Sequence, residues 1–106
     1  RPLVADAVVA GHDRSEVGVL LFLDDQGCGG LAEAEILARI GEAFAAHNLG
    51  QGGATTRIGR FLVLAEGPSE QHGEVTAKGS LNQGAILRRR ADWVVRLFAD
   101  GHVVGR

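Results

Sequence analysis

The stretch FLVLAEGPSEQHGEVTAKGSLNQGAILRRRADWVVRLF, residues 61–98, holds an apolar run, a long polar loop and an amphipathic segment, in that order. Its first apolar residues are continuous rather than alternating, which predicts a strand over 57–67 in the interior of a sheet. Loops as long as the polar one that follows are often functional. Ser80, with Gln83 three residues later, forms a capping-box pattern, so we expect a helix over 81–99.

This last helix is expected to divide its side chains between an apolar stripe and a charged face. Steps of three and four residues predict a buried stripe of Leu87, Ala91, Val94, Val95 and Phe98, flanked by Trp93 and Leu97. The charged residues that fall mostly outside this stripe are Arg88, Arg89, Arg90, Asp92 and Arg96. The tail, 100–106, is expected to form a last short element or to be disordered.

Two strands are predicted near the start of the chain, over 3–10 and 17–24, because both runs are apolar and rich in β-branched residues. Residues 11–16 predict a turn, so the two strands could pair as a hairpin, although a loop of this length does not force it. Residues 25–30, DQGCGG, predict a glycine-rich connection.

A second helix is expected over 31–49, where Ala, Leu and Glu dominate. Its inward positions are expected to be Ile36 or Leu37, Ile40, Phe44 and His47. Residues 50–56 predict a flexible link. The fold class is therefore α+β, a single domain with a small sheet of about three strands and two main helices.

Composition limits the classes of function. The net charge of −2 divides unevenly: residues 1–56 carry three arginines against eight acidic residues, and 57–106 carry seven arginines and one lysine against five. Only the second half could face an anion. A net negative charge and only five aromatic residues argue against a nucleic-acid-binding domain. No apolar run is long enough for a membrane helix. A single cysteine, Cys28, excludes an internal disulfide and suits a cytoplasmic protein.

Lys78 is the only lysine, and it lies on the polar loop between glycines, just before the expected helix start. A solvated turn lysine is the common alternative, but a helix N-terminus next to it also favours anions. The glycine-rich stretches lack the Lys-Ser/Thr pair of a phosphate loop, and the four histidines lack metal-ligand spacing. We therefore expect no metal site.

The quoted segment resembles the C-terminal end of AMP-forming acyl-CoA synthetases, most closely the feruloyl-CoA synthetase group. The matching residues are Glu66, Pro68 and Ser69 in a turn, Gly73, Glu74, Thr76, Lys78 and Gly79 in a lysine motif, and Asn82, Gln83, Leu87, Arg89, Arg90 and Ala91 in a helix start. The similarity covers nearly the whole chain. Ala77, Ser80 and Gly84 depart from the group's pattern, which bears on the substrate or on how the loop is held.

The resemblance implies that residues 1–106 are a mobile C-terminal lid domain. In such enzymes ATP and a carboxylic acid form an acyl-adenylate, and coenzyme A then displaces AMP. Lys78 would be the catalytic lysine of the first step, with Glu74, Thr76 and Gly79 shaping its loop. Residues 88–90 could contact coenzyme A phosphates, although a solvated face is an equal alternative.

The resemblance also implies the cofactors and partners. ATP, coenzyme A and Mg as nucleotide counter-ion would serve the full-length enzyme, with a large N-terminal domain as partner and a hydroxycinnamate-type acid as substrate. The chain begins with Arg1 and is interpreted as a piece of a longer polypeptide that alone is inactive, binds no cofactor and could form a homodimer. The alternatives are a non-catalytic docking module and a stand-alone anion- or nucleotide-binding domain.

Overall fold

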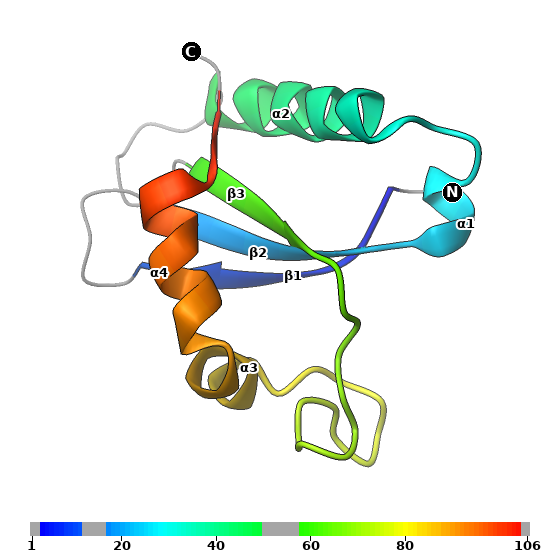
Figure 1. Ribbon diagram of the computed structural model, residues 1–106, viewed down its shortest axis with the longest axis vertical. Helices are drawn as coiled ribbons and strands as arrows, with labels where there is room; N and C mark the ends of the chain where they lie inside the picture. Colours follow the sequence, from blue (N-terminus) through cyan, green and yellow to red (C-terminus); the bar gives the residue numbers. More distant parts are fainter. Residues whose placement is uncertain (1–2, 12–16, 50–57, 105–106) are drawn as a thin grey trace.

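The computed structural model of the protein describes residues 3–11, 17–49 and 58–104. Within them lies a four-stranded mixed sheet with helices on both of its faces (Figure 1). The strands follow the order β1 (Val4–Ala10), β2 (Val17–Leu23), β3 (Ile58–Leu64) and β4 (His102–Val103). The expected α+β class with a small sheet is confirmed, and β4 comes from the tail.

The strand pairing explains the order of the sheet. β1 and β2 are antiparallel neighbours, which is the pairing that the sequence allowed but did not force. β2 and β3 run parallel, with the helix α2 (Glu33–Leu49) between them in the chain, and β4 adds an antiparallel edge to β3. β3 is therefore an interior strand, as predicted. The link predicted over 50–56 and the turn predicted over 11–16, apart from Gly11, lie outside the described residues.

β2 is buried on both faces and separates two apolar clusters. Leu20 and Phe22 pack toward α3 (Gln83–Arg89) and α4 (Ala91–Asp100). Val19 and Leu21 pack on the opposite face, toward α2. This alternation follows from the period of two in a strand. Figure 1 shows α2 on one side of the sheet and α3 and α4 on the other.

The α2 region departs from the prediction at its end. Ile36 and Ile40 are buried as expected, but His47 is exposed and Asn48 takes the inward position. The Asn48 side-chain amide donates to the Ile58 carbonyl oxygen and accepts from the Ile58 N–H, both at 2.8 Å. A polar side chain thus joins the end of α2 to the start of β3.

The glycine-rich connection contains a short helix, α1 (Asp25–Cys28), where a connection without regular structure was predicted. The Asp24 side chain accepts from the N–H groups of Gln26 and Gly27, which is how a helix start is capped. No helix in the described part of the chain is both long and apolar enough to cross a membrane.

The single helix predicted over 81–99 is wrong. The structure has α3 and α4, which meet at Arg90, where φ −107° and ψ 33° depart from helical values. Asn82, not Ser80, caps the first of them: its side-chain oxygen accepts from the Ala85 N–H at 3.1 Å.

The break also explains why the predicted stripe was partly wrong. Ile86 and Leu97 are fully buried, whereas Ala91 is exposed and Val95 is 63% exposed. One helical period drawn across the break cannot describe both helices. The other stripe residues, Leu87, Val94 and Phe98, do pack against the core, as predicted.

Candidate functional site

The polar loop between β3 and α3 ends in a tight turn that carries Lys78. Thr76 donates its N–H to the Ser80 carbonyl oxygen at 2.8 Å, and Gly79 donates its N–H to the Thr76 carbonyl oxygen at 2.9 Å. Val75 and Leu81 pair across the base of this turn. Gly79 has φ 85°, a left-handed conformation that favours glycine, and such a residue commonly closes a three-residue hairpin loop. Lys78 is exposed at the tip.

Thr76 contributes more than its backbone to the turn. Its hydroxyl oxygen accepts a hydrogen bond from the Ser80 N–H at 3.2 Å. With Gly79, it therefore contributes to the local geometry of the turn.

Glu74 and Arg90 form a buried ion pair beneath the loop. The Glu74 side chain is 0% exposed, and that of Arg90 is 6% exposed. Arg90 Nε donates to Glu74 Oε2 at 2.8 Å, and Nη2 donates to Oε1 at 2.9 Å, so the contact is bidentate. The Ser69 N–H also donates to Glu74 Oε1, at 2.9 Å.

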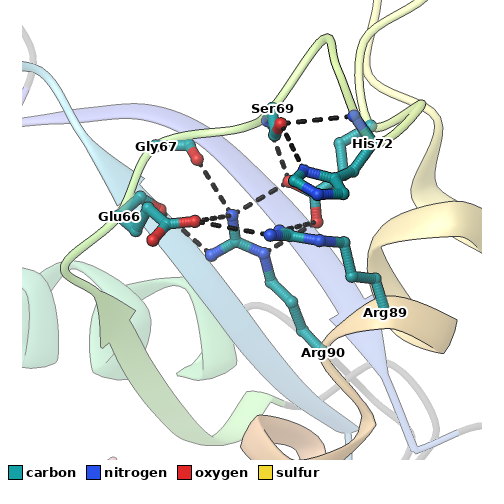
Figure 2. Close-up of polar contacts among 7 residues, drawn as sticks. Glu66, Gly67, Ser69, His72, Arg89 and Arg90 are labelled. Carbon is teal, nitrogen blue, oxygen red and sulfur yellow. Dashed lines mark hydrogen bonds and ion pairs between the residues drawn. The ribbon is translucent and has the colours of Figure 1, made fainter.

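The Arg90 guanidinium also holds the chain that leaves β3. Its Nη1 donates to the Glu66 carbonyl oxygen at 3.0 Å, and its Nη2 donates to the Gly67 carbonyl oxygen at 2.9 Å. One face of the group lies over the Phe22 ring, 5.2 Å from the centroid. Figure 2 shows the Arg90 side chain reaching from the helices to Glu66 and Gly67.

Arg89 supports the same pair from the side. Its Nη1 lies 3.3 Å from Glu74 Oε2, and its Nη2 lies 3.7 Å from Glu66 Oε1. Hydrogen bonds from Arg90 lower the pKa of Glu74 from its ordinary value of 4.5 to about 2, although burial acts in the opposite direction. The same hydrogen bonds raise the pKa of Arg90. The pair therefore stays charged at neutral pH.

A hollow of about 440 Å³ lies beside this pair, between the end of β3 and the start of α4. Its lining includes Glu66, Arg89, Asp92 and Trp93 but no residue of the Lys78 turn. Lys78 thus does not point into a cavity with these residues.

No three His, Cys, Asp or Glu side chains within the described ranges lie close enough together to hold a metal ion. The site instead consists of an exposed lysine, Lys78, and a buried ion pair between Glu74 and Arg90. Its exposed ammonium can meet an anion, and its buried guanidinium shapes the backbone that presents that ammonium.

Residues 1–102 match the family model described as the AMP-binding enzyme C-terminal domain. The chain belongs to this family. A similar fold occurs in the A-PCP didomain of carboxylic acid reductase (CAR) from Segniliparus rugosus, solved in complex with AMP, with 18% sequence identity and a TM-score of 0.70. The match covers 92% of this chain and 14% of that one. No protein in the curated set matches the chain.

Within this C-terminal domain, the predicted site residues divide into two groups. The turn gathers Thr76, Lys78 and Gly79, and Glu74 lies beneath them. Of the three arginines over 88–90, Arg88 and Arg89 are exposed and Arg90 is buried.

Placing Arg90 outside the buried stripe was wrong, because the carboxylate of Glu74 and two carbonyl oxygens satisfy its charge in the interior. Arg89 is partly covered by its contacts with Glu66 and Glu74. The sequence analysis also missed the roles of Glu66 and Gly67, which act through backbone carbonyl oxygens that no sequence pattern marks.

Proposed function

We propose that this domain is the mobile lid of an ATP-dependent, AMP-forming acid–CoA ligase, and that Lys78 supplies its ammonium to the adenylation step. The observation that carries the proposal is Lys78 at the exposed tip of a tight turn, in a domain of the AMP-binding enzyme C-terminal family. A large N-terminal domain would provide the pockets for ATP and the acid.

The chemistry of the first step suits such a lysine. A carboxylate oxygen attacks the α-phosphorus of ATP, a new P–O bond forms, and the bond to pyrophosphate breaks with its electron pair on the leaving group. Two anionic groups must approach each other, and charge builds on the phosphoryl oxygens. A compact ammonium with three donors on a flexible stem can contact both groups. Closure of a lid would also exclude water from the acyl-adenylate.

In the second step the thiol of coenzyme A attacks the acyl carbon, the C–S bond forms, the bond to AMP breaks, and the thiol proton passes to solvent or a base. Arg88 is our candidate for a coenzyme A phosphate contact, because it is exposed. Arg89 and Arg90 already contact carboxylates, which makes them weaker candidates. Mg would accompany the phosphates of ATP as their counter-ion.

The substrate proposed is an aromatic acid of the hydroxycinnamate type. It rests on the likeness of the segment from Glu66 to Ala91 to the feruloyl-CoA synthetase group. The structural likeness to a carboxylic acid reductase didomain gives a second candidate for the full-length protein, in which the acyl-adenylate serves a reductase instead of a CoA ligase. A non-catalytic docking module remains the third candidate.

The test uses the full-length protein and compares the wild type with Lys78→Ala and Lys78→Arg. ATP–pyrophosphate exchange with ferulate, benzoate and a short aliphatic acid reports the first step. Thioester formation from preformed acyl-adenylate and coenzyme A reports the second. We expect Lys78→Ala to lower exchange by roughly a hundredfold, the scale for loss of one charge-stabilising donor, and to spare the second step.

Lys78→Arg keeps the charge but changes the compact ammonium to a planar fork, so it should restore little of the exchange. Equal exchange in all three proteins would contradict the catalytic role. Exchange without thioester formation in the wild type would favour the reductase candidate.

A further inference from the structure

One buried polar side chain connects the Lys78 loop to the helices of the domain. Of residues 65–82, Glu74 is the one whose side chain is fully buried. The remaining residues of this loop are exposed or only partly covered, and Leu81, at the base of the hairpin, packs against the apolar core. The contacts of Glu74 therefore show how the loop is held beyond this apolar contact.

Those contacts connect Arg90 to Lys78 through a short path. Arg90 holds the Glu74 carboxylate with two hydrogen bonds. The Glu74 carbonyl oxygen accepts from the Asn82 N–H at 2.8 Å, which closes the base of the hairpin that carries Lys78. Asn82 in turn caps α3, at the other end of which stands Arg90. Both legs of the hairpin are thus tied to the same helix.

We propose that Arg90 is a positioning residue for Lys78, which acts through Glu74 to hold the Lys78 hairpin in the pose that adenylation requires. This inference rests on the function proposed above. The observation that supports it is the buried guanidinium of Arg90, which donates four hydrogen bonds. Two go to Glu74, and one each goes to the carbonyl oxygens of Glu66 and Gly67.

The geometry explains why the residue has to be arginine. A guanidinium presents five donors in a rigid plane, and four are used here in two directions. The ammonium of a lysine has three donors and no fork, so it cannot hold the carboxylate in a bidentate contact and both carbonyl oxygens as well. A buried ion pair often adds little net stability compared with apolar residues, whereas its directional bonds fix geometry.

The experiment is a double-mutant cycle on the full-length protein. The variants are Arg90→Lys, which keeps the charge, and Glu74→Gln, which keeps the size, each alone and combined with Lys78→Ala. Both half-reactions are measured, as above. Arg39→Lys is the matched control, since Arg39 lies on α2 and makes an exposed ion pair with Glu35.

We expect Arg90→Lys and Glu74→Gln to lower pyrophosphate exchange by roughly tenfold to a hundredfold, the scale for misplacing a catalytic group by about an ångström. Thioester formation from preformed adenylate should stay within roughly threefold of the wild type. In the Lys78→Ala background the same changes should cost nothing further, because the group they position is gone. Arg39→Lys should leave both steps unchanged.

Amide hydrogen exchange supplies a readout independent of activity. Arg90→Lys should speed exchange at Thr76, Gly79 and Asn82, whose N–H groups close the hairpin, and leave the amides of β2 protected. If Arg90→Lys unfolds the whole domain, the amides of β2 will exchange faster as well. Glu74→Gln then tests the positioning role in its place, because it keeps the size of the side chain and three of the four acceptors of Arg90.

Each outcome separates the two ideas. If Lys78→Ala does not affect ATP–pyrophosphate exchange, the proposed function fails and this inference fails with it. If Lys78→Ala abolishes ATP–pyrophosphate exchange but Arg90→Lys does not lower it, only the positioning role fails. The positioning role also fails if Arg90→Lys slows both half-reactions equally, or if its effect persists in the Lys78→Ala background, because either result indicates a general structural defect.

Discussion

The sheet and the Lys78 loop are stabilised by different means within one small domain. Both faces of β2 are covered by apolar side chains, including Leu20, Leu21 and Leu97, which are 0% exposed. The loop over 65–82 has one fully buried side chain, and that is a carboxylate. The sheet thus depends on apolar burial, and the loop depends on an ion pair with its hydrogen bonds.

This difference has a functional meaning. Apolar contacts are non-directional, so they hold a scaffold together while tolerating small shifts. Charged hydrogen bonds impose distances and angles, so they can fix where a backbone lies. On the function proposed above, a lid that presents one ammonium to a substrate site gains from both: a firm sheet, and a loop whose pose is set by geometry. The two regions should therefore fail in different ways.

The largest effect is expected from breaking the ion pair on one side only. Arg90→Met leaves the Glu74 carboxylate buried without a partner, which should lower the free energy of unfolding by about 3–5 kcal/mol. Glu74→Gln combined with Arg90→Met removes the unpaired charge and should recover much of that loss. Denaturant unfolding of the three proteins measures both effects.

Arg39→Met serves as the control, because an exposed i, i+4 pair with Glu35 contributes only about 0.3–0.5 kcal/mol. A loss for Arg90→Met as small as that of Arg39→Met would show that the loop does not depend on its buried pair.

Acid should weaken the loop region next, because the pKa of Glu74 is lowered to about 2 in the folded protein. A lowered pKa gives stability that is present above the ordinary value of 4.5 and is lost as the pH falls from there through about 2. A shift of this size corresponds to about 3 kcal/mol. Unfolding measured at pH 6 and pH 2.5 should show this loss in the wild type.

Glu74→Gln cannot titrate at this position, so its loss of stability between the same two pH values should be smaller by most of that amount. Equal losses in the two proteins would mean that other carboxylates cause the acid sensitivity and that the pair contributes little.

The two regions also differ in what the sequence could reveal. The strands β1, β2 and β3 and the helix α2 were predicted nearly at their true positions, because apolar periodicity directly encodes burial. The exposed position of Lys78 on a loop was also predictable from its glycine neighbours. Arg90 was not: a helical period places it outside the stripe, and its burial depends on Glu74, sixteen residues earlier.

The same limit applies to the break between α3 and α4. A capping box at Ser80 and an apolar stripe drawn over 81–99 favoured one helix, and only the tertiary contacts of Arg90 show why the chain bends there. Asn48 was missed for a similar reason, since its partner Ile58 lies across a connection. Polar groups satisfied over long sequence distances leave no local pattern, and the pair of Glu74 and Arg90 at the candidate site is one of them.

A smaller effect is expected from crowding the apolar region, where α4 approaches β2 most closely. A Cβ atom on Gly18 would lie 2.6 Å from Leu97 Cδ2 and 3.1 Å from Phe98 Cζ. Leu97 is fully buried and has little room to move, so Gly18→Ala should cost about 1–3 kcal/mol, the usual price of overpacking. Denaturant unfolding again measures the loss of unfolding free energy. The backbone amides of the Lys78 hairpin should keep their hydrogen-exchange rates.

Leu97→Ala sharpens this last prediction, because it removes the Leu97 atoms that lie closest to the new methyl group and leaves only the contact with Phe98 Cζ. In that background Gly18→Ala should cost clearly less than in the wild type, because the new methyl group fills part of the cavity. Additive losses would place the strain of Gly18→Ala in the backbone of β2 instead of in its contact with α4. Faster exchange in the Lys78 hairpin of Gly18→Ala would show that the apolar and the polar region are coupled after all.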